Sequence, residues 1–127
     1  MKDFNYELII AADREEVFAA LTVPFQIELW SGYPAIMDDK EGTEFSLWEG
    51  DICGKNLSIT PNKEIVQEWY FGESEAKSIA CIKLKINQNK TRLILSHKNI
   101  PDEVYDEICE GWREYYLGSM QNFLEMY

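Results

Sequence analysis

A single histidine, His97, is the only side chain in the 127-residue sequence whose ordinary pKa suits proton transfer near neutral pH. Its spacing to the cysteines and aspartates is not that of a zinc site. The sequence also lacks the common nucleophile, zinc-protease, phosphate-loop and dinucleotide motifs. We therefore expect a strand histidine whose ring is satisfied by a tyrosine or a backbone carbonyl, in a protein that is not an enzyme and holds no metal or cofactor. An enzyme using His97 beside a tyrosine or glutamate remains the alternative.

Aromatic side chains with polar groups gather near the C-terminus. Indole N–H and phenol O–H groups need polar partners when they are buried, so such residues can supply the polar contacts of an apolar ligand cavity. We predict a hydrophobic small-molecule site whose walls come from the C-terminal segment and from the strands: Phe45, Leu47, Trp69, His97, Tyr105, Trp112 and Tyr116. The alternative, that these side chains simply fill the core, stays open.

The segment from Pro101 to Tyr127 has the pattern of one long amphipathic helix. At 100° per residue its acidic residues take one arc, and the apolar residues take the other. The apolar arc comprises Val104, Tyr105, Ile108, Cys109, Trp112, Tyr115, Tyr116, Met120, Phe123 and Met126. An arc this broad indicates a helix that a curved sheet contacts on several sides. Gly111 and Gly118 fall at its edge, where we expect close approach of a neighbouring backbone, or else a kink that shapes the pocket.

The rest of the chain predicts two short helices and six strands. Lys2–Ile10 alternates as a strand, Asp13 and Glu16 form a capping pattern for a first helix, and Pro24–Trp30 is predicted as a second helix closed by Gly32. A loop follows over 32–41. Short turns then separate five strands, predicted at 42–48, 52–60, 64–71, 78–86 and 91–98.

Connections this short allow only antiparallel neighbours. The predicted fold is therefore α+β: a single domain over residues 1–127, with a curved six-stranded antiparallel sheet wrapped on the C-terminal helix and two short helices between its first two strands.

Charge and composition limit the partners. The sequence has 23 acidic and 12 basic residues, a net charge of −11, so we expect no binding to nucleic acid or to anionic membranes. The acidic residues either aid solubility or form a surface for a basic partner protein. Three widely spaced cysteines and the absence of an export signal favour a cytoplasmic protein with reduced thiols packed in the core.

An ordered series of short motifs resembles one protein family. The series runs through Val17–Pro24 with Leu29-Trp30, Gly42–Gly50, Gly54–Leu57, Pro61–Trp69, Thr91–His97, Ile100-Pro101 and Glu110–Tyr116. It is similar to the C-terminal domain of the activator of Hsp90 ATPase, within the START-like, helix-grip (SRPBCC) superfamily. The resemblance covers nearly the whole chain.

This resemblance implies a helix-grip fold and, as superfamily members commonly have, a cavity between the long helix and the sheet. It also implies a second functional hypothesis, a co-chaperone that binds an Hsp90-type chaperone and modulates its ATPase. The full-length co-chaperone carries a further domain ahead of this one, to which the family assigns much of the chaperone contact. We therefore expect ligand binding as the leading function and chaperone modulation as the alternative.

Overall fold

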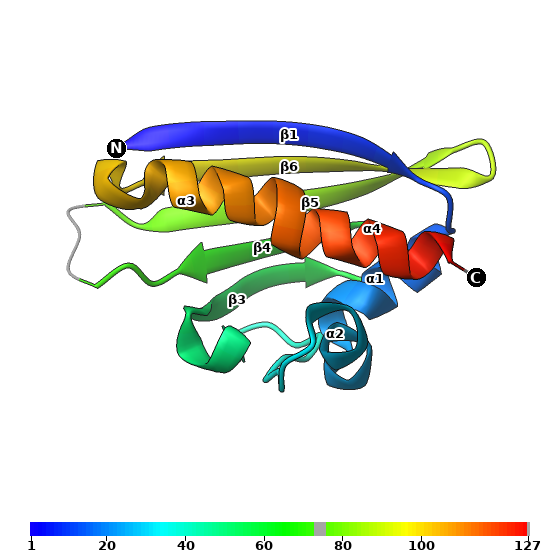
Figure 1. Ribbon diagram of the computed structural model, residues 1–127, viewed down its shortest axis with the longest axis horizontal. Helices are drawn as coiled ribbons and strands as arrows, with labels where there is room; N and C mark the ends of the chain where they lie inside the picture. Colours follow the sequence, from blue (N-terminus) through cyan, green and yellow to red (C-terminus); the bar gives the residue numbers. More distant parts are fainter. Residues whose placement is uncertain (73–75, 127) are drawn as a thin grey trace.

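Six antiparallel strands form one curved sheet in the computed structural model, which describes residues 1–72 and 76–126 (Figure 1). The strands are β1 (Lys2–Ile10), β2 (Glu44–Leu47), β3 (Ile52–Thr60), β4 (Glu64–Trp69), β5 (Ser78–Asn87) and β6 (Lys90–Ile100). Their order across the sheet is β1-β6-β5-β4-β3-β2. Strands β2 to β6 thus form a meander, as the short connections between them require. The N-terminal strand β1 pairs with the last strand, β6.

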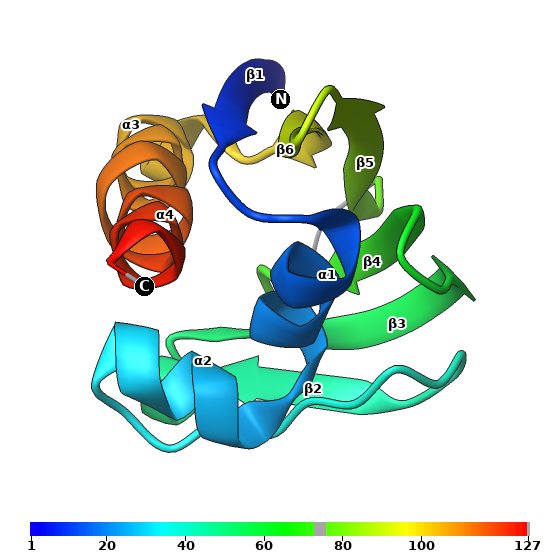
Figure 2. The same ribbon diagram turned by 90° about the vertical axis from the view of Figure 1, so that its right-hand side faces the viewer.

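Two short helices follow β1: α1 (Arg14–Thr22) and α2 (Pro24–Ser31). The Asp13 carboxylate caps α1 by accepting the Glu16 amide N–H at 2.9 Å, as predicted. Gly32 ends α2 with a φ of 84°, a conformation that glycine adopts without strain. Figure 2 shows both helices at one end of the curved sheet, on the side where the C-terminal helices lie.

The C-terminal segment is one continuous helical run on the concave face of the sheet (Figure 2). It comprises a short 3₁₀ turn (Asp102–Val104), α3 (Tyr105–Glu110), a π-helical segment, η3 (Gly111–Tyr116), and α4 (Leu117–Glu125). Its inner side contributes Trp112, Tyr116, Leu117, Met120 and Leu124 to the core. The predicted helix-grip architecture is confirmed, although Pro101 precedes the helix and Tyr127 lies outside the described residues.

The π-helical segment corrects the predicted inner face of this helix. Tyr115 and Met126 are 61% and 78% exposed, although the helical wheel placed both inside, whereas Leu117 and Leu124 are buried. A π segment accommodates one extra residue, so side chains turn progressively away from the α-helical wheel within it, and those after it are shifted by about 100° around the axis. The apolar residues after the π segment therefore face the sheet in a different register.

The two helical glycines have different surroundings. A Cβ on Gly118 would lie 2.5 Å from the backbone carbonyl oxygen of Arg113, five residues earlier in the same helix. A Cβ on Gly111 would meet nothing within 4 Å. The predicted close approach is therefore wrong for Gly111, and at Gly118 the approaching backbone is the helix's own π turn.

The boundaries of β1 and β3 agree with the prediction to the residue. Strand β2 is shorter than predicted, because Trp48 and Glu49 leave the strand with φ values of 50° and 55°. Strand β4 ends at Trp69 rather than Phe71, and β6 extends two residues further to Ile100. The predicted loop 32–41 carries one isolated bridge, between Ile36 and Ser46.

Candidate functional site

His97 lies at the centre of a hydrogen-bond chain beneath the C-terminal helix, in which both of its ring nitrogens have partners. The Trp112 indole N–H donates to His97 Nδ1 at 2.9 Å, so Nδ1 carries no proton. The proton therefore sits on Nε2, which lies 2.8 Å from Ser78 Oγ, and the Ser78 hydroxyl donates to the Lys98 carbonyl oxygen at 3.2 Å. The predicted partners of the ring, a tyrosine or a carbonyl, are wrong: a tryptophan and a serine satisfy it.

Burial fixes the protonation state of this imidazole. His97 is fully buried, and desolvation lowers its pKa from 6.5 to about 4, against a smaller opposing effect of Asp3. The ring is neutral at pH 7, and both of its nitrogens are occupied by hydrogen bonds. A histidine in this state has a structural role, because it offers no free nitrogen to a reacting group.

Aromatic rings pack directly around His97. The ring centroids of Trp69 and Trp112 are 4.8 Å apart and those of Trp112 and Tyr116 are 4.6 Å apart, while Trp69 also lies 4.8 Å from His97. Phe45 meets Trp69 edge-on at 6.5 Å. Separations this short leave no room for another molecule between the rings.

Six of the seven predicted site residues share this buried core, since Leu47 belongs to it as well. The structure places the seventh, Tyr105, apart from the others. Tyr105 is half-buried near the N-terminus, where its hydroxyl donates to the Asp3 carbonyl oxygen at 2.9 Å and the Lys2 ammonium lies 5.0 Å from its ring centre. Burial also raises the pKa of the Tyr116 hydroxyl, so it stays protonated.

A second buried polar chain leads from Trp69 toward the surface. The Trp69 N–H donates to Gln67 at 3.1 Å, and the Gln67 amide donates to Asn56 at 2.9 Å. Asn56 in turn donates to the Thr43 hydroxyl at 3.3 Å, which donates to the Asp38 carboxylate at 2.6 Å. This last bond lowers the pKa of Asp38, so the carboxylate ends the network at the surface. Sequence reasoning missed Gln67 and Asn56, although both stand at inward positions of alternating strands.

A surface groove of about 430 Å³ opens beside this core, between the π-helical segment and the turn after β2. Its lining includes Tyr33, Trp48, Asp51, Ile52, Gly111 and Tyr115. The Trp48 ring lies 5.7 Å from that of buried Tyr116 and 5.9 Å from that of Trp30. Trp48 thus joins the groove to the aromatic core.

Two conformational features converge on this groove. Trp48 and its neighbour Glu49 both have positive φ, a conformation that costs non-glycine residues roughly 1–3 kcal/mol each. On the other wall, Gly111 and Tyr115 belong to the π-helical segment, a form that occurs frequently at functional sites. The sequence gives no local signal for this groove, because both features arise from the packing of distant elements.

Within residues 1–72 and 76–126, no three histidine, cysteine, aspartate or glutamate side chains are grouped so that they could hold a metal ion. No helix in the same part of the chain is long and apolar enough to cross a membrane. Cys109 is buried, whereas Cys53 and Cys81 are only partly buried, so the expected core position holds for one of the three cysteines.

Comparisons with known proteins relate the chain to Hsp90 activators. Residues 11–125 match the family model described as "Activator of Hsp90 ATPase homolog 1-like protein". A human relative, activator of 90 kDa heat shock protein ATPase homolog 1, is 28% identical over 112 residues, which are 86% of this chain and 33% of the relative. The chain therefore spans about a third of the length of the curated relatives that it matches.

Solved structures share the fold along the whole chain. An HSP90 activator from Plasmodium falciparum superposes with a TM-score of 0.89 at 27% identity, covering 98% of this chain and 97% of that one. The Aha1 dimer from Colwellia psychrerythraea, at 20% identity and a TM-score of 0.86, shows the same fold. With the family model matching nearly all of its length, the chain belongs to the activator of Hsp90 ATPase homolog 1-like family.

Proposed function

We propose that this protein is an accessory of an Hsp90-type chaperone, which it binds and whose ATPase it stimulates. The observation that carries the proposal is the likeness to the Plasmodium falciparum HSP90 activator, whose solved chain is matched over 97% of its residues. At 27% identity, this likeness supports chaperone activation as the function of the present chain.

The geometry of the core favours a binding role over chemistry. His97 has both ring nitrogens occupied, and the rings around it are in direct contact. Function is therefore expected on the outer surface.

The outer side of the C-terminal helical run exposes a row of carboxylates: Glu103, Asp106, Glu107, Glu110 and Glu114. Such a row favours a basic surface on the partner and predicts salt-sensitive association.

The test is to measure the complex with an Hsp90-type chaperone of the same organism by calorimetry at two ionic strengths. We expect the dissociation constant to rise about ten-fold between roughly 50 mM and 300 mM salt, because exposed charge pairs are screened. Glu107→Lys/Glu110→Lys should weaken binding more than the equally charged control Asp39→Lys/Glu41→Lys. Absence of a complex at high protein excess would remove the proposal.

A second candidate function is binding of an apolar, aromatic small molecule in the groove beside Trp48. It is favoured by the strained conformation of Trp48, which holds an aromatic wall over Tyr116. The site is displaced from the predicted interior position, because the interior rings already contact one another. The ligand would lie against Trp48 and Tyr115, with the interior residues beneath it.

Thermal stabilisation by lipids, sterol-like compounds and aromatic metabolites tests this second candidate. Gly111→Phe should fill the groove and abolish the shift without disturbing the core, because nothing lies within 4 Å of the added Cβ. Gly111→Ala is the matched control and should leave the shift intact. An equal shift in both variants would place any ligand elsewhere.

A further inference from the structure

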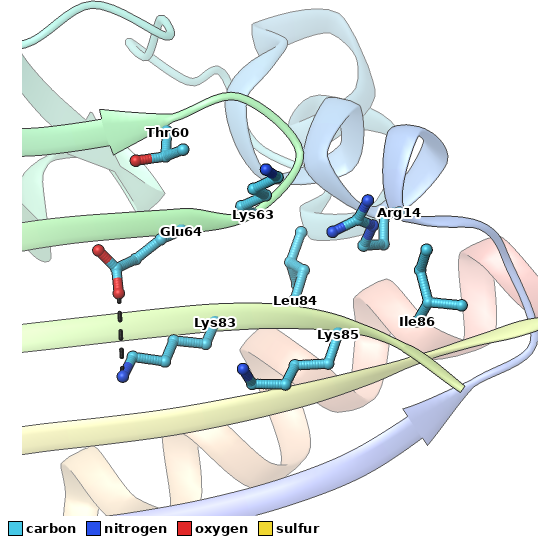
Figure 3. A pocket seen from close by; sticks show the side chains of 8 residues that line it. All are labelled: Arg14, Thr60, Lys63, Glu64, Lys83, Leu84, Lys85 and Ile86. Atoms are coloured by element: carbon cyan, nitrogen blue, oxygen red, sulfur yellow. Dashed lines mark ion pairs between the residues drawn. The ribbon is translucent and has the colours of Figure 1, made fainter.

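A groove lined by cationic side chains lies between the start of α1, the turn from β3 to β4, and the end of β5 (Figure 3). Its volume is about 560 Å³. Arg14 comes from α1, Lys63 from the turn, and Lys83 and Lys85 from β5. These residues lie up to 71 positions apart in the sequence, from Arg14 to Lys85, so only the fold brings them together.

The charge of this groove is opposite to that of the whole protein. The chain has 12 basic and 23 acidic residues, yet four of the basic side chains line the groove with a single carboxylate, Glu64. The one ion pair, Lys83 with Glu64, is long at 4.0 Å and partly exposed. Pairs of this kind contribute little stability and are readily replaced by an incoming carboxylate.

The remaining cations have no such partner. Arg14, Lys63 and Lys85 form no ion pair with any residue in the ranges 1–72 and 76–126. In a strongly acidic protein, three unpaired cations at one groove attract an anionic group to a single place on the surface.

One edge of β5 is free beside this groove. The last residue pair between β4 and β5 is Glu64 with Lys83, and the Leu84 N–H then donates to the Lys63 carbonyl oxygen at 2.8 Å. Strand β5 continues to Asn87, and in the described part of the chain these last residues pair only with β6. An unpaired strand edge offers backbone groups to a further extended segment.

The side chains along this edge alternate in chemistry. Lys85 is the first residue of the free edge, and Lys83, in the part of β5 paired with β4, lies two residues earlier on the same face at a spacing of roughly 7 Å. Acidic side chains at alternate positions of an extended segment have the same spacing. Ile86, on the other face, is 68% exposed and offers an apolar contact. Cations spread along a line suit a segment with several carboxylates better than a single phosphate, which needs donors converging on one point.

We propose that this groove binds an acidic, extended segment of a partner protein, which lies along the free edge of β5 with its carboxylates on Lys63, Lys83, Lys85 and Arg14. The lysines reject basic segments and accept acidic ones, so they supply selectivity at an otherwise open edge. The proposal does not depend on the chaperone proposal, because the acidic row on the C-terminal helix involves none of these residues.

A fluorescein-labelled peptide of alternating glutamate and valine residues is the probe, and its binding is followed by fluorescence anisotropy. Wild-type protein should bind it in a salt-sensitive manner, and the same peptide with lysine in place of glutamate should not bind. Lys63→Glu/Lys85→Glu should weaken binding at least about ten-fold, since two attractions become repulsions. The control Lys55→Glu/Lys98→Glu carries the same charge change outside the groove and should change binding by less than about three-fold.

Two further measurements decide between modes of binding. Proline in place of the central valine of the probe keeps its charge but removes a backbone N–H, so addition along the strand edge predicts clearly weaker binding. Equal binding of the proline peptide, equal losses in the two double variants, or displacement of the probe by millimolar inorganic phosphate at constant ionic strength would each overturn the proposal. Circular dichroism of both variants verifies that they are folded.

Discussion

Acidification should destabilise the protein through its one histidine. In the folded state the pKa of His97 is lowered to about 4 by burial, whereas an unfolded chain has the ordinary value of 6.5. Between these values the unfolded state binds a proton that the folded state does not. The free energy of unfolding therefore falls as the pH decreases from about 6.5 to about 4, and at 1.36 kcal/mol per pKa unit the total loss is about 3 kcal/mol.

The assay combines two measurements. Proton NMR reports the titration of the single imidazole directly, with no other histidine signal to confuse it. Urea unfolding between pH 7 and pH 4 gives the free energy of unfolding for wild-type protein and for His97→Asn, in which an amide oxygen replaces the acceptor of the Trp112 N–H. Carboxylates titrate in both proteins, so the difference between the two pH profiles isolates the histidine.

The expected result is a wild-type profile that falls more steeply than that of the variant throughout this window. A folded-state pKa near 6.5, or two parallel profiles, would refute the reasoning. Either outcome would mean that water reaches the ring or that the Trp112 hydrogen bond is absent.

Further predictions concern the same helix, and urea unfolding measures each of them. Trp112→Phe should destabilise the protein by about 2–4 kcal/mol, because it removes buried volume and leaves His97 Nδ1 without a donor. A loss below about 0.5 kcal/mol would contradict the hydrogen bond between Trp112 and His97. Gly118→Ala should destabilise by about 1–3 kcal/mol, because its Cβ would clash with the Arg113 carbonyl, whereas Gly111→Ala should stabilise by up to about 1 kcal/mol. Equal effects of the two alanine substitutions would argue against the π turn.

Local pattern was sufficient for most of the fold. Strands β1 and β3 were predicted to the residue because β1 alternates over most of its length and turn residues precede and follow β3, at Glu49-Gly50-Asp51 and Pro61-Asn62. The caps of α1 and α2 were likewise readable from Asp13, Pro24 and Gly32. These features depend on neighbours within a few positions, which is why a single sequence reveals them.

The inner face of the C-terminal helix could not be read in the same way. A wheel drawn at 100° per residue assumes an unbroken α-helix, and the π turn over Gly111–Tyr116 invalidates it from that turn onward. Tyr115 was consequently placed inside and Leu124 outside the predicted arc. Gly118 is the one signal in the sequence, because only a residue without a side chain fits above the Arg113 carbonyl.

The candidate sites were predictable only in part. Residue chemistry identified Trp69, His97, Trp112 and Tyr116 as inward-facing, and the structure brings them together. It could not show that these rings contact one another directly and leave no cavity between them. The groove lies beside Trp48, at the surface. Grooves formed by elements distant in sequence, such as the cationic groove beside β5, depend on tertiary packing and leave no pattern in a local window.

ATP turnover by an Hsp90-type chaperone of the same organism, measured as this protein is added alone, tests the central claim most directly. An inhibitor of the chaperone's ATPase supplies the background to subtract. We expect turnover to rise with added protein and to saturate. Unchanged ATP turnover at high excess of this protein, together with no detectable complex under the same salt conditions, would contradict the account.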